Sequence, residues 1–200
     1  MTIICHGDSL TEGADVEKAY AWPSLLENRL RIPVVNNGIG GDTTGGMLSR
    51  FSFDVLQKRP RFVILLGGIN DLWWDLALNL IQANLFSMVC QAQHHDIAPV
   101  MALPLPVWVE KARVQDWAPP VKGYAHFSDR LYGLVEALTL SVKDWDVALL
   151  DFYHPFFDDQ GQMRTDYFSD DGLHASRSGH FRMSQAAAAL FRDVFNCHMA

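Results

Sequence analysis

The stretch "TIICHGDSLTEG", residues 2–13, joins a short apolar run to a turn that contains Gly7, Asp8 and Ser9. Residues 2–5 have the composition of a buried strand. A serine beside Gly and Asp usually marks only a turn. In a parallel sheet, however, ligands bind beyond the carboxyl ends of the strands. If the chain supplies the other strands of such a sheet, Ser9 is predicted to lie at its ligand-binding edge.

Four further apolar runs are predicted strands: "PVVNN" (33–37), "RFVILLGG" (61–68), "APVMALP" (98–104) and "DVALLDF" (146–152). They are short and largely apolar on both faces, as a parallel sheet covered on both sides requires. Between them, helical patterns occupy residues 20–31, 44–58, 75–95, 122–144 and 178–196. This alternation predicts an α/β three-layer sandwich with right-handed crossovers. The last helix is expected to bury one small or apolar face: Phe181, Ser184, Ala188, Phe191 and Phe195.

Size and charge narrow the classes of function. The chain has 200 residues and is expected to form one domain over residues 1–200. Its net charge of −7 disfavours nucleic-acid partners, because such binding depends on Lys and Arg neutralising phosphates. No apolar run approaches the ~18 residues of a membrane span. The sequence leaves the oligomeric state open.

The amino terminus and the cysteines bear on the cellular compartment. Residues 1–13 lack the basic and apolar regions of a signal peptide. Cys5, Cys90 and Cys197 are widely spaced and are interpreted as free thiols, which suits a reducing compartment. A cytoplasmic location is therefore expected.

Small polar residues and glycines follow each predicted strand, so they are expected to meet at one edge of the sheet. They are Gly7, Asp8 and Ser9; Gly38, Gly40, Gly41 and Asp42; Gly67, Gly68, Asn70 and Asp71; residues 103–108; and "SDDGLHASRSGH" (169–180). The proline-rich pieces at 103–107 and 117–121 are predicted to bracket a surface excursion over this edge.

This set of residues permits nucleophilic catalysis. A serine hydroxyl needs a base, usually a histidine held by a carboxylate. Asp171 and His174 lie three residues apart, about one helical turn, and can supply both groups. Asp170 is an alternative partner for the histidine. Acyl transfer also needs hydrogen-bond donors for an oxyanion, and this sequence offers three candidates.

These oxyanion donors are expected on the same edge. They are the backbone N–H of Ser9, the N–H of Gly41, which has no side chain to prevent a close approach, and the side-chain amide of Asn70.

Four sequence blocks carry a family resemblance: "GDSLTEG" (7–13), "GGDTT" (40–44), "GGIND" (67–71) and "DGLH" (171–174). In order and spacing they resemble the blocks of the SGNH, or GDSL, hydrolase superfamily. The resemblance implies a flavodoxin-like five-stranded parallel sheet of order 2-1-3-4-5. It also implies hydrolysis of esters or thioesters of lipids, aryl alcohols or acetylated sugars, without cofactor or metal.

By this resemblance each block contributes to one site. Ser9 is the nucleophile, Asp171 and His174 complete a catalytic triad, and Ser9, Gly41 and Asn70 form the oxyanion hole. Two residues depart from the family pattern. Ala175 replaces a proline, which is expected to loosen the His174 loop. His6 precedes the first block, where it could alter the charge near Ser9.

Aromatic residues near the same edge predict an apolar substrate pocket. Trp73 and Trp74 are adjacent, so both rings cannot enter one core. The proposed pocket residues are Trp73, Trp74, Leu105, Val107, Trp108 and Phe168. Such walls favour a short or medium acyl chain, or an aryl group, over a polar sugar.

Other residues have structural interpretations. Asp8 is expected to hold the turn at Ser9, and Asp42 to be either a helix cap or a support of the site. His94, His95 and Asp96 are interpreted as a solvated helix end and not a metal site. His180 is interpreted as a surface or supporting residue.

The leading hypothesis is a cytoplasmic serine esterase that acts on a small-molecule ester. A carbohydrate O-acetylesterase and an acyl-thioesterase are alternatives, although only Arg50, Lys111 and Arg113 suggest a basic pocket mouth for the latter. A catalytically idle binding module is an alternative of a different class. A phosphate-binding protein is disfavoured because residues 38–46 lack the lysine and glycine spacing of nucleotide motifs.

Overall fold

A parallel sheet of five strands runs through the centre of the protein, in the order β2-β1-β3-β4-β5. The strands are β1 (Ile3–Gly7), β2 (Val34–Gly38), β3 (Phe62–Leu66), β4 (Ala98–Leu103) and β5 (Ala148–Asp151). This computed structural model describes residues 1–193. The predicted fold class and strand order are confirmed.

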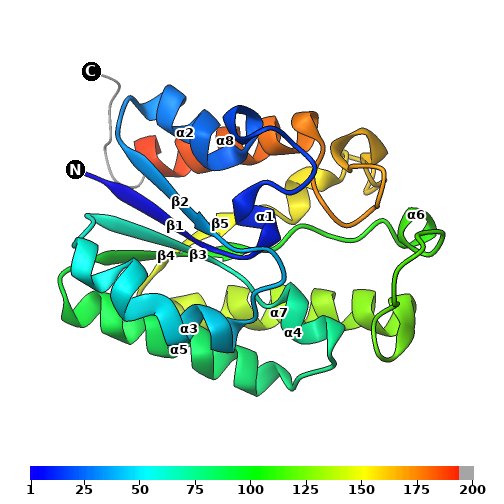
Figure 1. Cartoon of the computed structure of the whole chain (residues 1–200), viewed down its shortest axis with the longest axis horizontal. Coiled ribbons are helices and arrows are strands. Elements are labelled where there is room, and N and C mark those ends of the chain that lie inside the picture. Colours follow the sequence, from blue (N-terminus) through cyan, green and yellow to red (C-terminus); the bar gives the residue numbers. More distant parts are fainter. Residues whose placement is uncertain (194–200) are drawn as a thin grey trace.

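Helices cover both faces of the sheet (Figure 1). On one face lie α2 (Trp22–Leu30) and α8 (Arg177–Asp193), and on the other α3 (Thr44–Asp54), α5 (Leu78–His94) and α7 (Gly123–Trp145). Three short helices follow strands: α1 (Ser9–Glu12), α4 (Ile69–Trp73) and α6 (Val109–Ala112). Within residues 1–193 we find no helix with the length and apolar character needed to cross a membrane.

Burial follows the place of each strand in the sheet. Every residue of β1 and β3 is buried, as predicted for central strands. At the edge, β2 exposes Val35 and Asn36, so the expectation of two apolar faces is wrong for this strand. An edge strand has only one neighbour, and part of it therefore faces water.

The buried face of α8 differs from the predicted one. It consists of Gly179, His180, Met183, Ser184, Ala187, Ala188 and Phe191. Phe181 was expected on this face but is half exposed, and the guanidinium of Arg29 lies 4.5 Å from the centre of its ring. Phe195 lies outside the described residues. Ser184, Ala188 and Phe191 are thus buried as predicted, whereas His180 takes the buried place expected for Phe181.

The helix predicted from residue 75 begins only at Leu78, because Asp75 has a left-handed backbone (φ +57°). The Asp75 carboxylate accepts hydrogen bonds from Lys122, His126 and Arg130 at 2.6, 2.9 and 2.8 Å. The bonds from Lys122 and His126 lower the pKa of Asp75 to about 2. These contacts fasten the turn after α4 to the start of α7, next to the carboxyl edge of the sheet.

The described cysteines are free thiols. Cys5 is buried in β1 and Cys90 is exposed on α5, whereas Cys197 lies outside the described residues. Burial raises the pKa of Cys5 well above its ordinary value. This thiol is therefore a small apolar part of the core.

Gly38 allows α1 to pack closely against the end of β2. A Cβ at this position would lie 2.1 Å from the backbone nitrogen of Glu12 and 2.6 Å from its Cα. Because the obstacle is backbone, a side chain at this position must displace α1 and Ser9 with it.

We therefore expect Gly38→Ala to lower the free energy of unfolding by about 2 kcal/mol. Gly45→Ala, in α3, is the matched control, since its Cβ would make only ordinary contacts of 3.8 Å, with Asn84 Nδ2 and Thr43 Oγ1, and alanine favours a helix by up to ~1 kcal/mol. Urea unfolding midpoints should therefore move in opposite directions. Equal midpoints for the two variants would refute the close approach at Gly38.

Candidate active site

Ser9 lies where β1 passes into α1. Asp8 caps this short helix, because its Oδ1 accepts the backbone N–H of Leu10 at 2.9 Å. Complete burial raises the pKa of Asp8 to about 7. Ser9 is the first residue of α1, so its N–H has no acceptor within the helix. Asp8 thus holds the turn as expected, and the turn presents both the hydroxyl and the N–H of Ser9.

His174 connects Ser9 to Asp171. Its Nε2 lies 2.9 Å from Ser9 Oγ, and its Nδ1–H donates to Asp171 Oδ2 at 2.5 Å. The other oxygen of Asp171 accepts from Ser169 Oγ at 2.7 Å, and from the backbone N–H groups of Leu173 at 2.7 Å and His174 at 2.9 Å. The three-residue spacing therefore acts through a turn around Gly172 (φ +72°), not through the expected helical turn.

The two side chains shift each other's pKa in opposite directions. Burial alone would raise the pKa of Asp171, but hydrogen bonds from His174 and Ser169 hold it well below its ordinary value. Burial alone would lower the pKa of His174, but the hydrogen bond and charge of Asp171, with the charges of Asp15 and Asp8, raise it. The arrangement favours a carboxylate beside a basic imidazole, which suits general base catalysis.

Asp170, the alternative partner of the histidine, turns away from it. Its side chain is fully exposed, and its carboxylate lies 3.4 Å from Lys111 Nζ. Asp15 instead places its Oδ2 3.7 Å from His174 Nδ1.

Asp15, Asp171 and His174 each offer one potential metal-ligand atom within 4.8 Å of the others. Both ring nitrogens of His174 are already engaged, with Asp171 and Ser9. This histidine therefore has no free nitrogen for a metal ion.

Asn70 and Gly41 face the same space as Ser9. The side-chain amide of Asn70 donates one hydrogen to the carbonyl of Asp42 at 2.9 Å, which leaves its second hydrogen for an oxyanion. Gly41 has a left-handed backbone (φ +76°), and a Cβ there would meet no atom within 4 Å. The backbone conformation therefore favours glycine here, and the close approach of its N–H to a substrate oxygen stays a prediction.

Buried and partly buried side chains tie the first three sequence blocks together. Asp71 accepts from the N–H and the hydroxyl of Thr44 at 2.8 and 2.6 Å. Arg50 donates to the Gly7 carbonyl at 2.9 Å and to Asp42 at 2.7 Å. Asp42 is therefore a support of the site. The helix cap is Thr43, whose hydroxyl accepts from the N–H of residue 46.

His6 has a structural role in this network. It is fully buried, its Nε2–H donates to the Met47 carbonyl at 3.0 Å, and its Nδ1 faces Arg50 at 3.3 Å. Burial, with a smaller effect of Arg50, lowers the pKa of His6 to about 4. The side chain is thus neutral near pH 7 and does not place a charge near Ser9.

A pocket of about 600 Å³ opens at Ser9 and His174, a size suited to a small molecule. Trp73 and Trp74 both line it. Trp73 packs edge-on against Tyr124 and Phe127, whereas the Trp74 side chain is 62% exposed. As predicted, the two adjacent rings do not enter one core.

The other predicted wall residues do not line this pocket. Leu105 and Val107 are buried in the core. The connection between the two proline-rich pieces, residues 108–116, is exposed or partly exposed except at Ala112, which agrees with the predicted surface excursion. Phe168 is also buried, and the Trp108 ring lies 6.4 Å from it. The backbone N–H of Trp108 donates to the Gly172 carbonyl at 2.9 Å, so the segment after β4 supports the loop of Asp171.

Gly40 and Leu173 also line the pocket, and both belong to the segments expected at this edge. The lining residues that were missed are Leu10, Glu12, Ala14, Ile69, Trp117, Ala118 and Phe127. The position of Trp117 could have been predicted, because it is the first residue of the proline-rich piece 117–121, which flanks the segment predicted to cross this edge. Phe127 lies on α7 and gave no such signal.

The loop of His174 is held without the family's proline. Ser169 N–H donates to the His174 carbonyl at 2.9 Å, and Ser176 N–H donates to the Tyr167 carbonyl at 2.8 Å. Ala175 is buried between these bonds. These bonds hold the loop on both sides of Ala175, and the loosening expected from the alanine stays a prediction.

His180 is not a surface residue. It is buried, and its Nδ1 accepts a hydrogen bond from the backbone N–H of Trp22 at 3.2 Å. Burial, together with the charge of His174, lowers the pKa of His180 to about 4. By contrast, His94 and His95 lie at the exposed end of α5, as expected.

The fold and its relatives define an esterase-type hydrolase. The chain is 27% identical, over 98% of its length and 85% of the relative, to thioesterase 1/protease 1/lysophospholipase L1 of Escherichia coli K12. It is 30% identical to an arylesterase of Vibrio mimicus, over 86% of this chain and 78% of the relative.

Solved structures share the fold. One, assigned to the lipolytic G-D-S-L family and from Desulfitobacterium hafniense DCB-2, superposes with a TM-score of 0.81 at 26% identity, over 94% of this chain and 98% of that one. The GDSL-like Lipase/Acylhydrolase family matches residues 5–182. The protein belongs to this family.

Proposed function

We propose that the protein is a serine esterase that hydrolyses carboxylic esters of short or medium acyl chains. The observation that carries this proposal is the continuous chain from Ser9 Oγ through His174 to Asp171, with separations of 2.9 and 2.5 Å. It opens into a pocket that also contains Gly41 and Asn70. Nucleophile, base and oxyanion donors thus face one volume, as acyl transfer requires.

In the acylation step, Ser9 Oγ attacks the ester carbonyl carbon while His174 Nε2 takes the hydroxyl proton. The carbonyl oxygen becomes an oxyanion and accepts hydrogen bonds from the N–H groups of Ser9 and Gly41 and from Asn70 Nδ2. Asp171 stabilises the imidazolium through Nδ1. When the intermediate collapses, His174 returns the proton to the leaving alcohol and an acyl-enzyme remains.

In the deacylation step, His174 Nε2 takes a proton from water, and the resulting hydroxide equivalent attacks the acyl carbon. The same three donors hold the oxyanion. Collapse breaks the bond to Ser9 Oγ, which recovers its proton from His174, and the carboxylic acid leaves. One water is consumed in each cycle, and no cofactor enters it.

The pocket lining supports an apolar substrate. Ile69, Trp73, Phe127 and Leu173 form its apolar walls. Among the described lining residues, Glu12 has the only carboxylate and none is Lys or Arg. A coenzyme A thioester carries several negative charges, so this lining disfavours the thioesterase alternative.

A carbohydrate O-acetylesterase is the second candidate. Trp74 and Trp117 line the pocket with side chains that are 62% and 44% exposed. Exposed aromatic faces of this kind can stack against sugar rings. Apart from Ser9, Glu12, Asn70 and His174, the remaining lining consists of apolar residues and glycines, and we therefore place the simple ester first.

A comparison of substrates tests the proposal. We expect p-nitrophenyl butyrate to be hydrolysed with a higher kcat/KM than p-nitrophenyl acetate. Each methylene buried in the pocket contributes up to about 0.8 kcal/mol, roughly fourfold.

Acetylated xylo-oligosaccharides and butyryl-CoA should be cleaved at lower kcat/KM. Faster release of acetate from the oligosaccharides would favour the second candidate, and faster cleavage of butyryl-CoA would favour the thioesterase. No turnover of any of these compounds would favour the idle binding module.

A further inference from the structure

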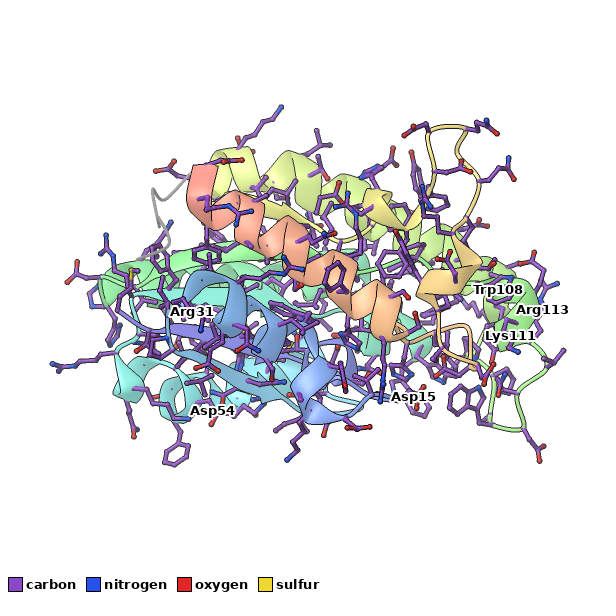
Figure 2. All side chains as sticks on the ribbon, turned by 90° about the horizontal axis from the view of Figure 1, so that it is seen from above. Asp15, Arg31, Asp54, Trp108, Lys111 and Arg113 are labelled. Carbon is purple, nitrogen blue, oxygen red and sulfur yellow. The ribbon has the colours of Figure 1, made fainter. Side chains whose placement is uncertain are left out.

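A second carboxylate approaches the imidazole of His174 from outside the four sequence blocks. Asp15 lies in the loop after α1, and its Oδ2 is 3.7 Å from His174 Nδ1. In Figure 2 it lies toward the same end of the molecule as Trp108, Lys111 and Arg113, whereas Arg31 lies toward the other end. This end contains the carboxyl edge of the sheet and the loop of His174.

Ser169 lies within hydrogen-bond distance of both carboxylates. Its Oγ is 2.9 Å from Asp15 Oδ2 and 2.7 Å from Asp171 Oδ1. The single hydroxyl proton serves one of these acceptors at a time, so Ser169 donates to Asp171 or to Asp15, and both carboxylates lie beside the same imidazole. Within residues 1–193 we find no Lys or Arg paired with Asp15, and its charge is therefore not neutralised by an ion pair.

We propose that Asp15 is a positioning residue that stabilises the imidazolium form of His174 together with Asp171. The inference rests on the proposed function, since it concerns the base of that reaction. Asp15 touches neither the nucleophile nor the pocket interior and acts only through the imidazole. Its half-exposed carboxylate limits the size of the effect by solvent screening.

The charges around His174 determine the direction in which its pKa should move when the Asp15 charge is removed. Asp171, Asp15 and Asp8 all raise its pKa, against the lowering effect of burial. The buried His180 is neutral near pH 7, and Asp170 is paired with Lys111. Removal of the Asp15 charge must therefore lower the pKa of His174.

The test is the pH dependence of kcat/KM for p-nitrophenyl butyrate in Asp15→Asn. Asparagine suits the left-handed backbone of this position (φ +66°) and keeps an acceptor for Ser169. We expect the acid limb of the kcat/KM profile to move to lower pH by roughly 0.2–0.7 pH unit. The plateau value of kcat/KM should fall by about 1.5- to fivefold, because the imidazolium of the transition state loses the stabilising charge of Asp15.

The two curves should converge at low pH. There the free enzyme and the transition state both carry the imidazolium, so Asp15 stabilises them equally and its removal has no effect on kcat/KM. Damage to the fold would lower the curve at every pH instead. Added salt should shrink the difference, because Asp15 is half exposed.

Asp170→Asn is the matched control. It removes the same charge from the neighbouring loop, where the carboxylate faces Lys111 and not His174. Its profile should coincide with that of the wild type. An unchanged profile in Asp15→Asn, or a uniform loss at all pH values, would overturn the inference. An inactive wild-type protein would instead refute the proposed function.

Discussion

Replacement of Ser9 by Ala is expected to lower kcat for p-nitrophenyl butyrate by a factor on the order of 10⁴ to 10⁶. The alanine has no oxygen to attack the carbonyl, so the acyl-enzyme cannot form. The residual rate would come from the oxyanion donors and from substrate binding. This is the largest effect that the proposed mechanism predicts.

The variant should remain folded. Ser9 is only partly buried, and α1 keeps its cap at Asp8 and its packing against β2. A melting temperature close to that of the wild type would show that the loss is chemical. A variant that keeps most of the wild-type kcat would mean that Ser9 is not the nucleophile.

Asn70→Ala is expected to lower kcat by roughly 10²–10³-fold, or about 3–4 kcal/mol, with little change in KM. Its amide is held by the Asp42 carbonyl at 2.9 Å, so the free hydrogen is fixed before the substrate arrives. Such a donor gains strength as negative charge develops on the carbonyl oxygen. It therefore acts mainly on the transition state and not on substrate binding.

Asn37→Ala is the matched control for this effect. Asn37 lies on β2, does not line the pocket, and also donates its amide to a backbone carbonyl, that of Asp54, at 2.9 Å. Asn37→Ala therefore removes a similar structural hydrogen bond but no oxyanion donor. If both variants lowered kcat equally, Asn70 would have a structural role only.

The sequence allowed much of the fold to be predicted because local patterns and tertiary structure agree. Buried central strands such as β3 are continuous apolar runs, and the residues after them must meet at one edge. The triad and oxyanion candidates follow from that rule together with the four sequence blocks. Hence Ser9, Asn70 and His174, far apart in the sequence, were expected to meet at one pocket.

The pocket walls and some burial patterns could not be predicted, because they depend on how segments cross the edge. Leu105 and Val107 follow β4 and continue into the core, whereas Trp117 reaches the pocket from the same connection. Helical period placed Ser184, Ala188 and Phe191 of α8 correctly, but packing buries His180 and leaves Phe181 half exposed. These outcomes depend on tertiary contacts that a single sequence does not encode locally.

Asp15 was missed for a related reason. It lies outside every sequence block, and an exposed aspartate in a turn is usually only a solvated residue. Its significance depends on the Ser169 hydroxyl, which is 154 positions away in the sequence. Only the folded chain brings these two residues to His174.

The central claim is that Ser9 is a nucleophile activated by His174, and covalent labelling tests it most directly. The protein is treated with a fluorophosphonate, and the modified peptide is identified by mass spectrometry. We predict one adduct, on Ser9, that is absent in Ser9→Ala and forms far more slowly in His174→Ala. An unlabelled wild-type protein, or an adduct on another residue with Ser9 unmodified, would contradict the claim.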